Sequence, residues 1–178
     1  MPTFAALLRG INVGPHRKLA MADLRQLLAE LGHGEVRTHL NSGNALFTSG
    51  AGPEQIQSEL EQAILRRLGM DVRVLVRSGA ELQAAVEENP LVEGATDGSR
   101  MLAIFLSEAP DPVLLATNDP LALDPDRTRI GNRIIYQWCP DGYLAAPSVS
   151  GFVEKHLGIS ATVRNWNTVT RLAELARS

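Results

Sequence analysis

The sequence predicts an α+β protein built from two β-α-β-β-α-β halves, each followed by one extra helix, with mainly antiparallel sheets. Short apolar runs alternate with stretches in which apolar residues recur at helical spacing. Clusters of turn-forming residues at 41–44 and at Gly131-Asn132 predict two hairpins. The order of elements repeats at about half the chain length. Two ferredoxin-like halves, residues 1–90 and 91–178, packed as one compact unit, are the simplest interpretation.

Local signals set the bounds of the elements in the first half. The expected elements are a strand at 4–8, a helix from Met21 to Gly32, strands at 36–40 and 45–48, a helix from Pro53 to Gly69, a strand at 71–76, and a helix that Ser78 and Glu81 begin and Pro90 ends.

The second half repeats this order. The expected elements are a strand at 101–106, a short helix at 112–117, a hairpin at 127–138, a short helix at 152–157 ending at Gly158, an edge strand at 159–163, and a C-terminal helix with Val169, Leu172, Ala173 and Ala176 on one face.

Composition sets limits on the class of protein. The 178 residues are 44% hydrophobic and 21% charged, as in globular proteins. No apolar run approaches the roughly 20 residues that cross a bilayer, and the start lacks a basic signal region, so we expect a cytoplasmic protein without a membrane partner. The net charge of −3 disfavours a dominant nucleic-acid surface.

Reactive and metal-binding groups are sparse. Cys139 is the only cysteine, which excludes an intrachain disulfide and favours a small buried filler over a nucleophile. The four histidines show no metal-ligand spacing, so no metal site is expected, and His33 is interpreted as a helix cap or solvent-facing residue. His16 and His39 are the only candidates for a general base near the loop described below. Catalytic residues, cofactor and enzymatic character therefore stay open.

The first candidate site is the loop LRGINVGPHRK at 8–18. Amides around Gly10 and Gly14, with a helix start near Ala20, suit an anion. Arg9, Arg17 and Lys18 would add positive charge. The spacing matches no named phosphate loop. A plain β-α connection explains the same residues and remains an alternative.

The second candidate is the turn Asn41, Ser42, Gly43 and Asn44, which is either only a tight turn or a source of amide groups for a ligand. In a ferredoxin-like sheet the first strand lies beside the third, because the crossover between the first two strands is right-handed. The loop after Arg9 and this turn should then be neighbours, with Arg9 and Asn12 close to Ser42 and Asn44.

The third candidate is the segment ATVRNWNTVTRL at 161–172. Asn165 or Asn167 can cap the last helix while Trp166 packs on the body of the protein. Arg164, the two asparagines and Thr168 equally suit a carboxylate or phosphate at a helix start.

Several motifs together resemble the mostly bacterial family known as domain of unknown function 1697. LLRGINVG with the helix LRQLLAELG, then VRTHLNSGN, then TVRNWNTVTRL occur in the family's order, and Asn89-Pro90 and Pro140-Asp141-Gly142 resemble its connecting landmarks. The resemblance spans essentially the whole chain and implies a duplicated ferredoxin-like architecture, with no established activity. His39 replaces a usual tyrosine, Pro15-His16-Arg17 replaces a glycine- and lysine-rich run, and Leu144 to Ser148 lacks the usual Ser-Lys pair.

Three functional hypotheses remain. The first is a pocket for a small phosphorylated or carboxylated ligand, formed by the 9–18 loop and the 41–44 turn, with or without 164–168. Its candidate ligand-binding residues are Arg9, Gly10, Asn12, Gly14, Lys18, Ser42, Gly43, Asn44, Arg164, Asn165, Asn167 and Thr168. The second is RNA or single-strand binding on a sheet, for which few aromatic residues are available. In the third, the motifs are structural, holding the halves together or forming a homodimer.

Overall fold

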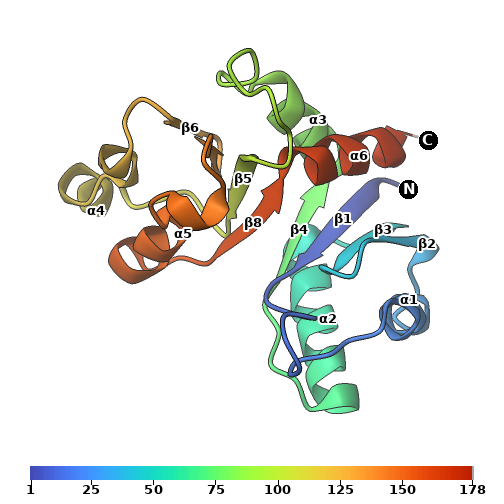
Figure 1. Ribbon diagram of the computed structural model, residues 1–178. Coiled ribbons are helices and arrows are strands. Elements are labelled where there is room, and N and C mark those ends of the chain that lie inside the picture. Colours follow the sequence, from blue (N-terminus) through green and yellow to red (C-terminus); the bar gives the residue numbers. More distant parts are fainter. Residues whose placement is uncertain (178) are drawn as a thin grey trace. The chain divides into compact units, whose positions relative to one another are not determined.

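Two four-stranded antiparallel sheets with helices make up the fold in a computed structural model that describes residues 1–177 (Figure 1). The chain divides into two compact units, Met1–Gln83 with Leu172–Ser178, and Ala84–Arg171. The first half was expected to end at residue 90. Instead, α3 (Gly79–Glu87) and α6 (Trp166–Arg177), the two extra helices, each give residues to both units.

The first unit has strand order β2-β3-β1-β4, the order of a ferredoxin-like sheet. Its strands and helices are β1 (Thr3–Leu8), α1 (Met21–Glu30), β2 (Gly34–His39), β3 (Asn44–Thr48), α2 (Pro53–Leu68) and β4 (Val74–Ser78). Both neighbours of β1 run antiparallel to it, with Ala6 opposite Ala45 on one side and Val76 on the other.

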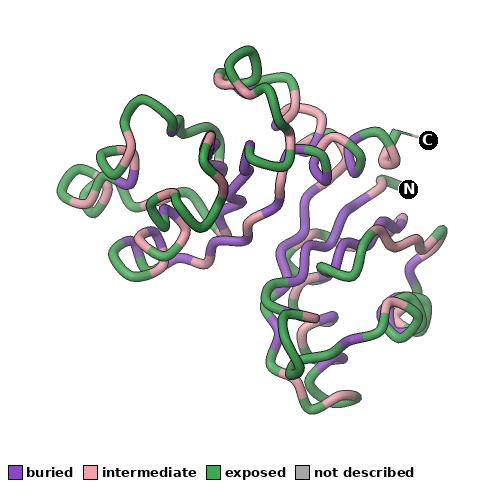
Figure 2. Tube along the Cα trace, viewed as in Figure 1, coloured by how far each residue is buried: buried purple, intermediate pink, exposed green. Residues whose placement is uncertain are grey.

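The core of the first unit lies between one face of this sheet and the helices α1 and α2. Alternate residues of β1, Phe4, Ala6 and Leu8, enter it together with Leu24 and Leu28 of α1. Helix α2 follows Pro53 and ends at Gly69, whose φ of +66° gives the left-handed turn that glycine adopts without strain. Strands β1, β3 and β4 are largely buried, β2 is mostly half-buried, and the loop after β1 is largely exposed (Figure 2).

The second unit repeats the order as β6-β7-β5-β8. Its elements are β5 (Met101–Leu106), α4 (Pro112–Thr117), η1 (Pro120–Leu123), β6 (Thr128–Gly131), β7 (Ile134–Trp138), η2 (Tyr143–Ala145), α5 (Val149–Phe152), the π-helical turn η3 (Val153–Leu157) and β8 (Ala161–Asn165).

One face of the second sheet packs against its helices. Ile104, Leu106 and Ile135 contact a cluster that contains Val149 and Val153. On the other face, the Tyr136 hydroxyl donates to the carbonyl of Ala85, 2.8 Å away, and the Tyr136 and Trp166 rings meet edge to face. The α+β prediction with two ferredoxin-like layouts is confirmed.

The structure corrects three local predictions. The second hairpin has Asn132 and Arg133 in its turn, one residue later than expected, and Arg133 takes a φ of +55°. The fourth strand of each sheet begins two or three residues later than the sequence pattern indicates, at Val74 and at Ala161. His33 is buried against Phe47 and does not face solvent.

Among residues 1–177, no helix is both long enough and apolar enough to span a bilayer.

Candidate functional site

The loop between β1 and α1 is held in shape by Asn12. Its side-chain amide donates to the carbonyls of Leu19 and Asn41, at 2.9 and 2.6 Å, and its Oδ1 accepts from the Leu19 amide at 2.9 Å. The Asn12 amide also donates to the Arg17 carbonyl, 2.9 Å away, which closes residues 12–17 into a compact turn. Asn12 itself has a φ of +55°, a conformation that asparagine tolerates better than most residues. These contacts give its side chain a structural role.

The 41–44 turn lies beside this loop, as the topology predicts. The Leu8 amide donates to the Gly43 carbonyl at 2.8 Å, and Asn12 reaches Asn41. Gly43 has a φ of +94°, and a Cβ there would lie 2.8 Å from Leu8 Cβ and from Ile11 Cδ1. Only glycine fits between these neighbours without a shift.

Asn44 closes the turn from inside. Its side chain is fully buried and donates to the His39 carbonyl at 2.8 Å and to Ser42 Oγ at 3.0 Å. Burial and internal hydrogen bonds favour the structural interpretation of Asn44. Of the four turn residues, Asn41 and Ser42 are exposed.

On its other side, β1 pairs with β4. The loop after β1 contacts residues 71–73, which lead into β4. The Arg9 amide donates to the Arg73 carbonyl, 3.0 Å away. Arg17 crosses this junction: its Nε donates to the Gly10 carbonyl at 2.8 Å and its Nη2 to the Asp71 carbonyl at 2.9 Å. The end of β1 therefore has the 41–44 turn on its β3 side and residues 71–73 on its β4 side.

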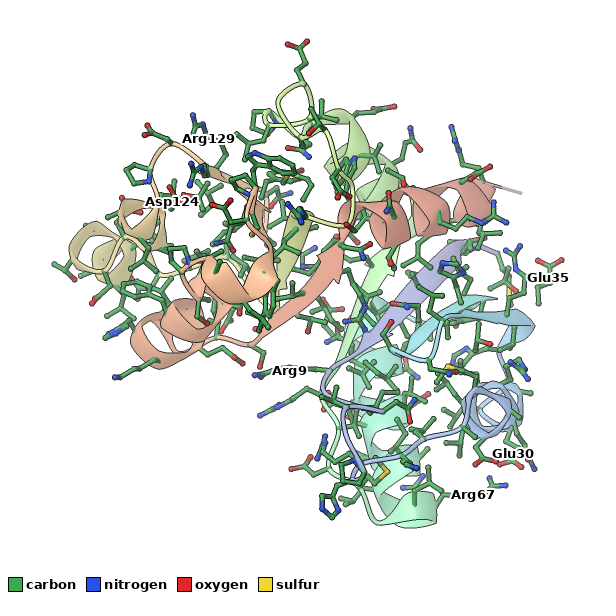
Figure 3. All side chains as sticks on the ribbon, in the orientation of Figure 1. Arg9, Glu30, Glu35, Arg67, Asp124 and Arg129 are labelled. Atoms are coloured by element: carbon green, nitrogen blue, oxygen red, sulfur yellow. The ribbon has the colours of Figure 1, made fainter. Side chains whose placement is uncertain are left out.

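A hollow of about 480 Å³ opens on the β4 side of the loop. We call it the Arg9 hollow, and its lining residues are Arg9, Gly10, Val13, Arg17, Asp71 and Arg73. Figure 3 shows the Arg9 side chain extending outward from the end of β1. The volume falls within the range of small-molecule sites, about 300 to 1,000 Å³.

Positive charge dominates the Arg9 hollow. Three guanidiniums and a single carboxylate, that of Asp71, belong to its lining. Glu61 on α2 is a second acidic group within electrostatic reach of Arg73. Burial raises the pKa of the Glu61 carboxyl, while the Val74 backbone and the Arg73 charge partly oppose that rise. Guanidiniums stay protonated at any physiological pH, so this arrangement favours an anion.

The hollow contains only part of the residues expected from the sequence. Arg9 and Gly10 line it, whereas Gly14 and Lys18 are exposed elsewhere on the loop, and Ser42, Gly43 and Asn44 belong to the turn on the β3 side of β1. Asp71 and Arg73 were missed as site residues. Strand order could have found them, since β4 borders β1 in this fold and brings the start of β4 beside the end of β1.

The third motif belongs to the second unit, where its residues have structural contacts. Asn165 Oδ1 accepts from the Thr168 amide at 3.0 Å, which confirms Asn165 as the cap of α6. Burial lowers the pKa of Arg164 to about 10, and its Nη1 donates to the Val163 carbonyl at 2.9 Å. Thr168 is also buried.

Two further residues of this motif, Trp166 and Asn167, contact the loop at Gly98. The Trp166 amide donates to the Gly98 carbonyl at 3.0 Å, and a Cβ at Gly98 would collide with Asn167 Oδ1. The Asn167 side chain therefore lies against a position where only glycine leaves room for it.

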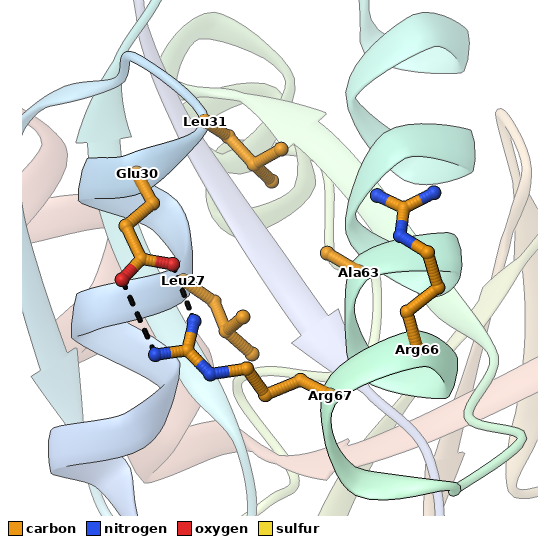
Figure 4. A pocket seen from close by; sticks show the side chains of 6 residues that line it. All are labelled: Leu27, Glu30, Leu31, Ala63, Arg66 and Arg67. Carbon is orange, nitrogen blue, oxygen red and sulfur yellow. Dashed lines mark hydrogen bonds and ion pairs between the residues drawn. The ribbon is translucent and has the colours of Figure 1, made fainter.

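A second hollow in the first unit, of about 290 Å³, lies between α1 and α2 (Figure 4). The Glu30 carboxylate pairs with the Arg67 guanidinium at its edge, and Leu27 and Ala63 form apolar walls. The charges of Glu30 and Arg67 at this edge therefore pair with each other.

The other reactive side chains do not line the Arg9 hollow. His16 and His39 are not among its lining residues. Burial raises the pKa of the Cys139 thiol to about 11, which keeps it protonated and unreactive, as expected for a buried filler. Among residues 1–177, no group of three or more His, Cys, Asp or Glu side chains could hold a metal ion.

The fold and site define a duplicated α+β protein with an arginine-lined hollow at the end of its first strand. The chain belongs to the family described as "Protein of unknown function (DUF1697)", whose model matches residues 1–136. The match includes the loop and the 41–44 turn and ends before the third motif.

A solved structure of a relative matches over the whole chain. It is described as a conserved bacterial protein, SP0830 from Streptococcus pneumoniae, and is 27% identical to this chain, with a TM-score of 0.78. The alignment covers 100% of this chain and 99% of the other. A search of curated proteins found no match.

Proposed function

We propose that this protein binds a small anionic ligand, phosphorylated or carboxylated, in the Arg9 hollow. The observation that carries the proposal is the meeting of three guanidiniums, from Arg9, Arg17 and Arg73, around one hollow with a single lining carboxylate. Guanidiniums recognise carboxylates and phosphates through paired N–H groups. A cytoplasmic location belongs to the same proposal, because the lone, buried Cys139 shows no use of an oxidising compartment.

The 41–44 turn contributes to this site indirectly. The carbonyls of Gly43 and Asn41 accept hydrogen bonds from the Leu8 amide and the Asn12 side chain. These bonds fix the end of β1, from which Arg9 projects. The third motif is better explained by a structural role, since Asn165 caps α6 and Trp166 packs on Tyr136.

Nucleic-acid binding has less support. Base stacking needs exposed aromatic rings, and within residues 1–177 Tyr143 is the only aromatic side chain classed as exposed. Phe4, Phe47 and Phe105 are all buried.

Isothermal titration calorimetry with phenyl phosphate and benzoate tests the proposal. We expect at least one of them to bind, and Arg9→Gln and Arg73→Gln each to weaken binding roughly 10- to 100-fold, because a hydrogen bond between charged groups contributes about 1.5 to 3 kcal/mol. Both side chains are exposed, so both variants should fold, which circular dichroism checks.

Arg67→Gln is the matched control. It removes the same charge from an exposed arginine in the same unit, at the other hollow. Equal affinity in the wild type and this control, with a loss in the Arg9 and Arg73 variants, supports the proposal. Failure of both anions to bind, or equal affinity in all four proteins, overturns it.

A further inference from the structure

The two sheets carry different side chains at one equivalent position of their helix-covered faces. In the first sheet, Phe4 of β1 lies opposite Phe47 of β3. In the second sheet, Leu102 of β5 lies opposite Gln137 of β7. The two sheets have the same strand order, and each pair is the second in its ladder, so the two pairs occupy equivalent places.

These equivalent places are filled differently. The rings of Phe4 and Phe47 belong to the core of the first unit, with their centroids 6.2 Å apart. Leu102 and Gln137 have no rings, and both line a hollow of about 190 Å³ in the second unit. We call it the Gln137 hollow. It lies between the sheet and residues 143–150. The second unit therefore has a hollow where the first unit has two aromatic rings.

The lining of the Gln137 hollow suits an uncharged ring. Leu102, Ile104 and Val163 line it on the side of the sheet, and Leu144, 95% exposed, lines it from the 143–150 segment. None of its lining side chains carries a charge, so the lining provides no partner for a charged ligand. An apolar cavity of about 150 Å³ binds benzene. The Gln137 hollow is therefore large enough for one six-membered ring.

The side chain of Gln137 adds an amide to this lining. It is 2% exposed, and its Nε2 donates to the Pro147 carbonyl at 2.9 Å, which fixes the orientation of the amide. Among residues 1–177, no hydrogen bond reaches its Oε1. A buried carbonyl oxygen is stabilised by a hydrogen bond and is costly to leave without one. A ligand with an O–H or N–H group would supply the missing donor.

We propose that the Gln137 hollow binds a small, uncharged aromatic molecule whose O–H or N–H group donates a hydrogen bond to Gln137 Oε1. The apolar side chains of the lining contact the ring, and the amide oxygen sets its orientation. This site shares no residue with the Arg9 hollow.

Phenol and toluene form a matched pair of test ligands. They share one ring, but only phenol carries a hydrogen-bond donor, and its hydroxyl, with a pKa of about 10, stays uncharged at pH 7.5. An NMR titration of the whole chain with each ligand measures the affinity and locates the site. We expect saturable amide shifts at Leu102, Gln137 and Val163. Phenol should bind roughly fivefold more tightly than toluene, because one hydrogen bond contributes about that factor.

Two variants and a control test the role of the lining. Gln137→Met keeps the length of the side chain and removes the acceptor, so the ratio of phenol affinity to toluene affinity should fall by roughly the same fivefold. Leu102→Phe introduces the ring that Phe4 provides in the first unit, and it should abolish saturable binding of both ligands by filling the hollow. Val113→Phe adds a ring at a 75% exposed position of the same unit outside the hollow, so it should leave both affinities unchanged.

The outcomes decide the proposal with or without the variants. Saturable phenol shifts at the Gln137 hollow, with a preference over toluene that Gln137→Met removes, support it. In the wild type, the absence of saturable phenol shifts at millimolar concentration, shifts confined to other residues, or equal affinities for phenol and toluene overturn it. Undiminished phenol binding in a folded Leu102→Phe variant overturns it as well. Arg9→Gln should leave phenol binding unchanged, so failure of this proposal is distinguishable from failure of anion binding.

Discussion

Replacement of Asn12 tests whether this residue shapes the loop. Asn12→Ala removes three side-chain hydrogen bonds, two to Leu19 and one to Asn41. At about 1 kcal/mol each, with less for the exposed bond to Asn41, they contribute about 2 kcal/mol. Alanine at a φ of +55° adds about 1 kcal/mol of strain. We therefore expect the free energy of unfolding to fall by about 3 kcal/mol.

Urea unfolding followed by circular dichroism measures this loss, and amide exchange at Leu8, which donates to Gly43, assigns it to the first unit. Asn12→Gly keeps the backbone relaxed and should recover about 1 kcal/mol of the loss. Asn41→Ala is the matched control, because only its backbone carbonyl accepts from Asn12, so we expect a change within about 0.5 kcal/mol. A stable Asn12→Ala, within 0.5 kcal/mol of the wild type by the same estimate, would refute the structural role.

Two further changes have defined outcomes. Gly43→Ala should lower the free energy of unfolding by at least about 2 kcal/mol, because its Cβ would lie 2.8 Å from Leu8 and Ile11 at a φ of +94°. Urea unfolding measures this loss, and Gly50→Ala, whose Cβ would meet only Met1 Sδ at an ordinary contact distance of 4.0 Å, should be neutral. Burial lowers the pKa of His33 below its ordinary value of 6.5, so the unfolded chain binds a proton that the folded chain does not. The contribution of His33 to the free energy of unfolding is therefore fully present above pH 6.5 and is lost as the pH falls below that value. If a His33→Gln variant loses as much stability as the wild type between pH 7.5 and 5.5, His33 does not cause the loss.

Local chemistry explains why much of the fold could be predicted. Pro53 and Gly69 mark the ends of α2, and Ser78 and Glu81 exchange the two hydrogen bonds of a capping box at the start of α3. These signals depend on residues close in sequence, so a single sequence reveals them. The sequence also predicted that the loop after Arg9 lies beside the 41–44 turn, because a right-handed crossover places the first strand next to the third.

The surroundings of individual side chains could not be predicted from the sequence alone. His33 follows Gly32 just after the end of α1, a position typical of an exposed helix cap. Its ring is instead buried against Phe47 of β3. The sequence pattern places Arg73 within a strand expected at 71–76, and the pairing of Leu8 with Val74 shows that it lies opposite Arg9 just beyond the paired residues. Both depend on strand register, which the local pattern sets only to within two or three residues.

The most direct test of the central claim is a map of backbone amide shifts in an NMR titration of the whole chain with phenyl phosphate at pH 7.5. Anion binding at the Arg9 hollow predicts saturable shifts at Arg9, Gly10, Val13 and Arg73. The amides around Leu27 and Ala63, at the hollow between α1 and α2, should stay unchanged. Saturable shifts confined to that second hollow, or no saturable shift at the Arg9 hollow, would contradict the account.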